Sequence, residues 1–290
     1  MSHKMSLPLT ILFCLCFSFA LVAADSKTPP AKLTAAQIVE KNIAARGGLQ
    51  AWRAVQTMSW TGKMDAGGGD SIARSRRAAL GTGRASKMEL MQKEATENKE
   101  PADKQVQLPF VMEMKRGRKS RVEIEFAGKT AIQVYDGTNG WKLRPFLNRN
   151  DVEPFTPEEL KSEAAKSDLD GPLVDHAAKG TKVEVEGIEP VEGRNAYKLK
   201  LTMKNGTVQH IWIDAENFLD VKVEGTPRRM DGRMHNVAVY QRDFRQVQGV
   251  LIPFLLETVV DGYPGRHKMV VEKAVINPKL DDALFTKIAQ

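Results

Sequence analysis

Hydrophobic and polar residues alternate along most of the chain with the period of a β-strand. Val122, Ile124 and Phe126 alternate with charged residues, and the same pattern recurs over residues 197–204. A period of two places the apolar side chains on one face of a sheet and leaves the polar ones in water. The pattern predicts further strands at residues 55–64, 110–116, 132–135, 182–186, 208–213, 219–224, 234–244, 251–260 and 268–276.

Two segments depart from this alternation and carry the signals that begin a helix. Thr34 is followed three residues later by Gln37, which forms a capping box, and Gly47 marks the end of the helix. A second helix is predicted over residues 156–166, where Pro at the first helical position and Glu159 in the first turn complete another capping box. The chain is therefore expected to contain two short helices and many more strands.

The strands follow one another without intervening helices, which predicts a mainly antiparallel sheet. Ten or more strands are too many for a flat sheet, so the sheet should curl. We therefore expect a mainly β fold with flanking helices: an incomplete antiparallel β-barrel, or half-barrel, covered by a helical lid. Residues 25–290 are expected to form one such domain, in which the polar residues 81–107 make a long mobile loop.

The N-terminal 24 residues have the composition of a secretory signal peptide. Lys4 precedes an apolar run, and Ala23 and Ala24 precede the charged Asp25. The run is short for a membrane span, which favours cleavage after Ala24 over a membrane anchor. Cys14 and Cys16 both lie inside this segment, so the mature chain has no disulfide or cysteine nucleophile. We expect a soluble periplasmic protein.

Charge and motifs narrow the possible functions further. The formal net charge is +7, and export makes nucleic acid an improbable partner for it, whereas anionic lipid headgroups attract such charge. The four histidines outside the signal segment lack the spacing of a metal site, and no nucleophile motif is present. No cofactor is implied. This pattern favours a binding protein over an enzyme, although an exported hydrolase with a pair of carboxylates stays open.

Methionine and aromatic residues gather on the apolar face of the predicted strands. Methionine is flexible and polarizable, which suits a surface that accepts varied apolar partners. An ordinary packed core is the other interpretation, and for any single residue it is the simpler one. If the face lines a cavity, its ligand-binding candidates are Trp60, Met112, Met114, Ile124, Phe126, Leu199 and Leu201.

A resemblance to a known family adds to this interpretation. The basic residues 114–121, the D-G-x-x-x-W segment from Asp136 to Trp141, the Trp212-Ile213-Asp214 segment and residues 281–285 resemble LolA/LolB-type outer-membrane lipoprotein-sorting proteins. The resemblance spans most of residues 35–285. It implies a half-barrel with a helical lid over an apolar cavity that receives acyl chains, and it adds Trp141 to the candidates.

The function expected on these grounds is a periplasmic carrier or binder of a lipidated protein or another acyl-chain ligand. Such a carrier would meet membrane-associated donor and acceptor proteins. Four basic residues are candidates for contact with headgroups or a partner: Arg116, Arg118, Lys119 and Arg121. A solvated hairpin tip explains them equally well. A sensor or scaffold domain that binds a protein partner without transport is a further alternative.

Overall fold

The computed structural model describes residues 33–66, 106–145, 149–263 and 265–289. All of them belong to one compact unit that begins at Leu33, and residues 1–32 form a separate unit whose structure lies outside this description. The expected signal peptide therefore falls outside the described residues. So do residues 81–105 of the expected loop, whereas Val106 and Gln107 already belong to a strand.

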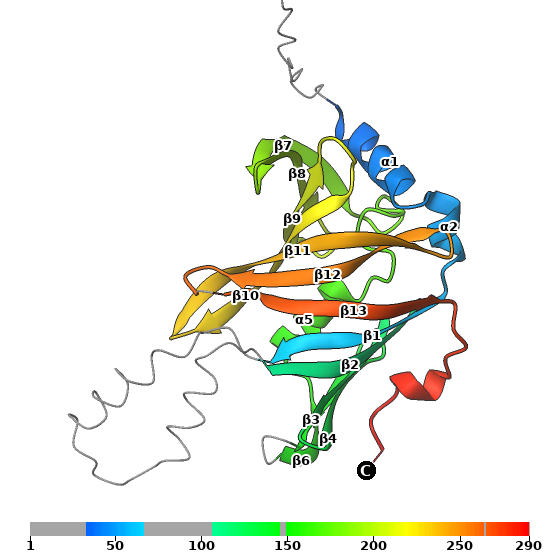
Figure 1. Ribbon diagram of the computed structural model, residues 1–290, viewed down its shortest axis with the longest axis vertical. Helices are drawn as coiled ribbons and strands as arrows, with labels where there is room; N and C mark the ends of the chain where they lie inside the picture. The colour runs from blue at the N-terminus through cyan, green and yellow to red at the C-terminus, as the bar shows by residue number, and fades with distance from the viewer. Residues whose placement is uncertain (1–32, 67–105, 146–148, 264, 290) are drawn as a thin grey trace, which may run out of the picture. The chain divides into compact units, whose positions relative to one another are not determined.

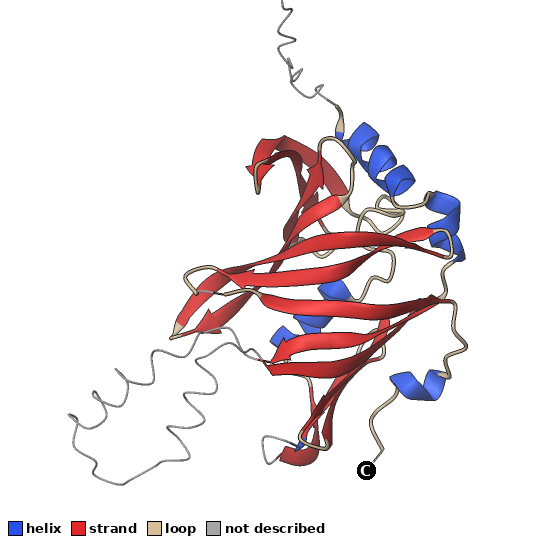
Figure 2. Ribbon diagram, viewed as in Figure 1, coloured by secondary structure: helices blue, strands red, loops and turns tan. Residues whose placement is uncertain are grey.

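The described residues form one antiparallel sheet of thirteen strands, shown in Figures 1 and 2. The order across the sheet is β6-β5-β4-β3-β2-β1-β13-β12-β11-β10-β9-β8-β7. The strands are β1 (Thr57–Ala66), β2 (Val106–Lys115), β3 (Lys119–Phe126), β4 (Lys129–Tyr135), β5 (Gly140–Arg144), β6 (Arg149–Pro154), β7 (Lys182–Val191), β8 (Arg194–Thr202), β9 (Val208–Asp214), β10 (Asp220–Met230), β11 (Arg233–Val247), β12 (Val250–Val260) and β13 (His267–Ile276).

The sheet is open, because β6 and β7 are its two edges. Strand β1 pairs with β2 on one side and with β13 on the other, so the first and last strands lie together inside the sheet. All other neighbours in the sheet are consecutive along the chain. The predicted fold class, an incomplete antiparallel barrel with helices over it, is confirmed.

All eleven predicted strands are present, with ends shifted by a few residues. Strands β5 and β6 were not predicted. Gly140 begins β5, and its hydrogen atom faces the ring of Phe155, since a Cβ there would lie 2.0 Å from that ring. β6 is rich in charge and contains Pro154, which gives it no alternating pattern to recognise.

Within the described residues, four helical segments accompany the sheet: α1 (Ala35–Ala45), α2 (Leu49–Ala54), α5 (Pro157–Lys166) and the 3-10 helix η2 (Asp282–Phe285). Both predicted capping boxes are confirmed. The Thr34 hydroxyl accepts a hydrogen bond from the Gln37 N–H, and the Thr156 hydroxyl accepts one from the Glu159 N–H. The sequence analysis did not predict α2 as a helix.

Two apolar clusters share one face of the sheet, which we call the inner face. The β1-side cluster includes Met58, Phe110 and Ile252, and the α1-side cluster includes Ile38, Leu199 and Ile213. The side chain of Ile43 packs against both clusters, which makes the two continuous. A third and smaller cluster around Trp212 lies on the opposite, outer face, because Trp212 alternates with Ile211 and Ile213 along β9.

Candidate ligand-binding face

The inner face is richest in methionine and aromatic side chains where β1, β2 and β3 lie side by side. The pairing sets Trp60 opposite Met112 and Met58 opposite Met114, and on the next strand Phe110 lies opposite Ile124. Directly opposed residues of antiparallel strands point to the same face. Three separate strands therefore bring these side chains together on one surface.

Four of the predicted ligand-binding residues are half-buried on this surface. Trp60, Met112, Met114 and Ile124 pack against the β1-side cluster, and each side chain remains partly exposed. Met64 and Met269, which the sequence analysis did not single out as candidates, pack beside them. The surface that these six residues form is called the methionine face below.

The other four predicted residues lie elsewhere. Leu199 and Leu201 are 0% exposed and belong to the α1-side cluster. Phe126, at the end of β3, is 42% exposed. Trp141 lies opposite Val134, which pairs with Arg121, so its ring is on the outer face. The eight ligand-binding residues predicted from the sequence are thus divided among the methionine face, a filled core, a strand end and the outer face.

Trp141 lines a surface hollow of about 520 Å³ on the outer face. Phe285 of η2 is buried beside it, and charged residues from three segments complete the wall. The lining consists of Lys119, Asp136, Thr138, Asn139, Trp141, Asp282, Phe285, Thr286 and Lys287. Because the wall is mixed and charged, this hollow differs in chemistry from the methionine face.

Helix α5 lies over the inner face and is held there by polar contacts. In Figure 1 it runs behind β12, β13 and β1. Lys142 Nζ of β5 contacts Glu159 at 2.5 Å, and the Ser120 hydroxyl of β3 donates to Glu163 at 2.9 Å. On the other side, Ser162 donates to Thr226 of β10 at 3.3 Å. The helix thus touches strands on both sides of the methionine face through side-chain oxygens and nitrogens.

An ion pair between Lys142 and Glu159 is one of the contacts that hold this helix. The Lys142 side chain is only 7% exposed, and that of Glu159 is 38% exposed. Burial alone would raise the pKa of Glu159, but the hydrogen bonds from Lys142 and the Thr156 N–H, with the nearby positive charges, lower the pKa below its usual value. Glu159 is therefore held ionised, and the pair fixes the first turn of α5 to β5.

Four basic residues were predicted to contact headgroups or a partner, and each has an intramolecular partner. Arg118 donates to the carbonyl of Ala164 at the end of α5. Lys119 contacts Asp282 of η2 at 2.7 Å. Arg121 pairs with Glu123 and donates to a carbonyl of η2. Any contact of these residues with an outside anion must therefore compete with a bond that is already made.

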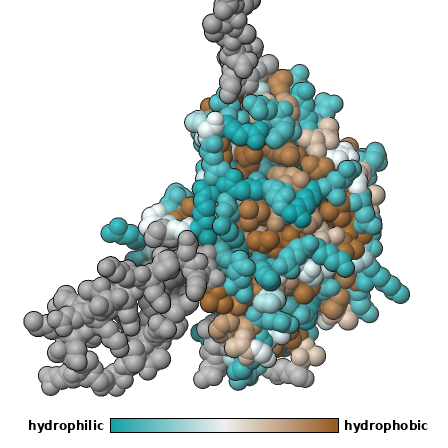
Figure 3. Space-filling view, in the orientation of Figure 1, coloured by the Kyte–Doolittle hydropathy of each residue, from teal (hydrophilic) through white to brown (hydrophobic). Residues whose placement is uncertain are grey.

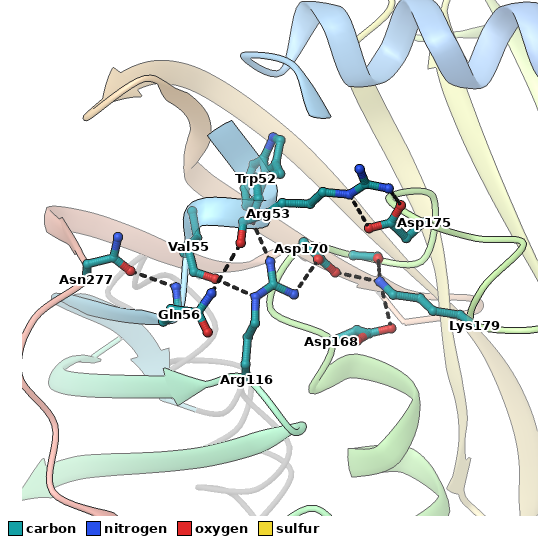
Figure 4. A network of polar contacts seen from close by, with 11 residues as sticks. Trp52, Arg53, Val55, Gln56, Arg116, Asp168, Asp170, Asp175, Lys179 and Asn277 are labelled. Carbon is teal, nitrogen blue, oxygen red and sulfur yellow. Dashed lines mark hydrogen bonds and ion pairs between the residues drawn. The ribbon is translucent and has the colours of Figure 1, made fainter. Parts of the chain in front are cut away.

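Arg116 has the most complete set of partners of the four (Figure 4). Its Nε donates to the Val55 carbonyl at 2.6 Å and its Nη2 to the Trp52 carbonyl at 2.6 Å. Its Nη1 pairs at 2.8 Å with Asp170, whose side chain is 2% exposed and also binds Lys179. The guanidinium satisfies carbonyls at the end of α2 and joins them to the segment after α5.

The sequence analysis missed the polar residues that hold α5. Ser120 continues the inner-face parity of Val122 and Ile124, and Lys142 and Glu163 are ordinary charged residues in sequence. The one usable signal was the parity of Ser120, because a hydroxyl among apolar positions implies a buried partner. The partners of Lys142 and Glu163 come from distant segments and are visible only in the fold.

The part of the chain that the structure describes contains no group of three or more metal-binding side chains. Within the same residues, every helix is too short or too polar to cross a bilayer.

On the outer face, Figure 3 shows apolar patches between bands of polar side chains. Exposed apolar surface is therefore not confined to the inner face, and the cover by α5 is what distinguishes the methionine face.

Neither a protein-family model nor a curated protein matches the sequence. Solved structures do match. A LolA superfamily protein from Nitrosomonas europaea has 14% identity and a TM-score of 0.51, and the match covers 88% of this chain and 98% of that one. A putative outer membrane lipoprotein-sorting protein domain from Vibrio parahaemolyticus has 11% identity and a TM-score of 0.50, with 87% and 95% covered.

A DUF1329 family protein from Desulfovibrio piger is similar to the same degree, with 13% identity, a TM-score of 0.51, and 89% and 98% of the two chains covered. At these identities the matches show a shared fold and nothing finer. The chain has the fold of the LolA superfamily and of outer-membrane lipoprotein-sorting domains, as the resemblance in its sequence implied.

Proposed function

We propose that this protein is a periplasmic carrier or binder of acyl chains, borne either by a lipidated protein or by a lipid, and that it acts without catalysis. The observation that carries the proposal is the methionine face: half-buried apolar side chains on the inner side of an open sheet, beneath a helix held by polar contacts. The shared fold with a lipoprotein-sorting domain supports the same assignment.

The energetics require a covered apolar surface. An acyl chain of about 16 carbons gains roughly 12 kcal/mol on leaving water, at about 0.8 kcal/mol per methylene. Flexible methionine side chains adapt to such a chain with little strain. The cover must also open, and polar contacts suit this because water replaces them when they break, which limits the net cost to about 1 kcal/mol each.

Membrane-associated donor and acceptor proteins are the partners that such a carrier requires. Arg118 and Lys119 are the basic residues best placed to meet headgroups or these partners, because Arg118 lies in the turn before β3 beside α5 and Lys119 begins β3 beside η2. A negative partner that drew Arg118 away from the Ala164 carbonyl would free one contact of α5. Partner binding and opening of the cover are coupled in this way.

Export is tested separately from binding. We expect the mature protein to begin near Asp25, and N-terminal sequencing of protein recovered from the periplasm checks this. Recovered protein that begins at Met1, or recovery only from the cytoplasm, contradicts the location and leaves the binding proposal untouched.

The binding test compares two neighbouring residues of β2. Met112 points to the inner face and Val111, which is 36% exposed, points to the outer one. Met112→Gln keeps the length of the side chain but adds an amide whose burial costs about 1–3 kcal/mol. We expect this variant to weaken displacement of a fluorescent fatty acid by palmitate about five- to hundredfold, whereas Val111→Gln leaves it unchanged.

Thermal melts on both variants establish that they are folded. Equal weakening by the two substitutions, or no displacement by palmitate in the delipidated wild type, contradicts the proposal. In the second case, a domain that binds a protein partner becomes the better assignment.

A further inference from the structure

The indole N–H of Trp60 is the polar atom of the methionine face without a partner. Its Nε1 is shielded from solvent and makes no hydrogen bond to any of the residues that the structure describes. Trp60 lies on β1 between Met112 of β2 and Ala274 of β13. Thioether sulfur is only a weak acceptor and the alanine methyl is none, so these two neighbours cannot satisfy the donor.

The two tryptophans that are buried as whole side chains among the described residues both make a hydrogen bond. Trp52 donates to the Arg46 carbonyl at 3.0 Å, and Trp212 donates to Glu189 at 3.0 Å. This is the usual arrangement, since a buried indole N–H normally finds an acceptor. Trp60 departs from the pattern that the same chain follows twice.

Trp60 also differs from other side chains of the described region that have a shielded atom without a partner. Each of those has a second polar atom that is bonded, so the group as a whole keeps a partner, whereas the indole has a single donor. The partly satisfied side chains are Asn42, Arg144, Asp214 and His235.

An unpaired buried donor is costly, and natural proteins keep few of them without a functional reason. We propose that Trp60 donates a hydrogen bond to the carbonyl oxygen of the bound acyl group, so that the site takes acyl esters or amides in preference to plain hydrocarbon chains. This inference rests on the proposed function and adds to it the chemical class of the ligand and its anchoring residue.

The arrangement explains how one surface combines affinity with a fixed position. The methionine side chains supply adaptable apolar contact but no direction, because dispersion and the hydrophobic effect are non-directional. A single donor in their midst fixes the depth at which the carbonyl oxygen sits. The flexible thioethers around Trp60 are the groups that move aside when the oxygen approaches.

The test uses a matched pair of ligands and a matched pair of variants. Methyl dodecanoate and tridecane differ mainly in the ester, and both are used to displace N-phenyl-1-naphthylamine from the delipidated full-length mature protein. Trp60→Phe removes the N–H while keeping an aromatic ring. Trp212→Phe, on the outer face, removes an N–H that is already bonded to Glu189.

We expect Trp60→Phe to weaken binding of methyl dodecanoate about five- to tenfold, the value of one hydrogen bond, and to leave tridecane binding unchanged. Trp212→Phe should leave the ratio between the two ligands unchanged. Equal losses for both ligands in Trp60→Phe overturn the anchoring role, because they show that only the shape of the ring matters. Binding of neither ligand by the wild type defeats the proposed function itself.

NMR of the indole N–H groups tests the same hydrogen bond in the wild-type protein, where no substitution can alter stability. The chain has four tryptophans, so protein labelled with 15N at the indole gives few cross-peaks, and the Trp60→Phe spectrum assigns one of them. Methyl dodecanoate should move the Trp60 indole proton downfield, and tridecane should not. A shift of the same size with both ligands overturns the hydrogen bond.

Discussion

The two clusters of the inner face are covered in opposite ways. Helix α1 inserts Ile38 and Val39, which are 0% and 4% exposed, into the α1-side cluster, where Leu199 and Leu201 are 0% exposed. Helix α5 contributes no residue to the β1-side cluster and is held over the methionine face by polar contacts. The difference separates a core that apolar side chains fill from a surface that a helix covers through polar contacts.

The composition of the two helices is the cause. α1 alternates apolar and polar residues with helical period, so one face has large side chains to bury. In α5, Leu160 is the one large apolar residue, and the residue that the helix buries is the charged Glu163. A helix without an apolar stripe gains little from burial and stays in place through hydrogen bonds and charge.

The largest expected effect concerns the filled core. Leu199→Ala removes a side chain that is 0% exposed and leaves a cavity, which should lower the free energy of unfolding by about 2–5 kcal/mol. Affinity of the folded fraction for palmitate should not change. Urea denaturation and probe displacement measure the two quantities, and a loss of affinity with little loss of stability would place Leu199 in the binding surface instead.

A smaller loss of stability is expected on the methionine face. Met112→Ala should lower the free energy of unfolding by roughly 1–2 kcal/mol, less than at a fully buried site, because Met112 is only half-buried. Its affinity for palmitate should fall as apolar contact is lost. A destabilisation as large as that of Leu199→Ala would show that the face is packed as tightly as the α1-side cluster and would remove the contrast.

The third prediction concerns pH and the cover. The pKa of Glu159 is lowered in the folded protein, so the stability that this group contributes is present above its unfolded pKa and is lost as the pH falls through the folded pKa. Glu159→Gln should cost about 1 kcal/mol near neutral pH, a low value because Glu159 is partly in water.

The measurement is the dissociation rate of a fluorescent fatty acid from the wild type and Glu159→Gln between pH 7 and pH 3. We expect the wild type to release the ligand faster as the pH falls, and the variant to release it fast already at neutral pH with a weaker pH dependence. Identical rates and pH profiles in both proteins would show that the ion pair does not hold the cover.

The smallest effect is expected on the outer face of β1, the strand that carries Trp60 on its inner face. Lys63 of β1 pairs with Glu272 at 3.5 Å, and the two side chains are 50% and 55% exposed. Such exposed pairs contribute little, so Lys63→Ala should change stability by less than about 0.5 kcal/mol and leave palmitate binding unchanged. A clear loss of binding would mean that ligand contacts extend to the outer face.

The sequence by itself determined eleven of the thirteen strands, the faces on which their side chains lie and the caps of α1 and α5. A period of two is a local property, so it identified eleven strands and the common face of Met112, Met114 and Ile124. The capping boxes at Thr34 and Thr156 are equally local, since each joins residues three apart. These features need no knowledge of the rest of the chain.

Only the tertiary structure decided what covers each part of the face. Leu199 and Met112 have the same kind of position in their strands, yet one lies beneath the apolar stripe of α1 and the other near the polar helix α5. Likewise, the partners of Arg116 and Lys142 come from segments 54 and 17 residues away. Periodicity fixes the direction of a side chain relative to its own strand, whereas burial and pairing depend on which distant segment the folded chain places against it.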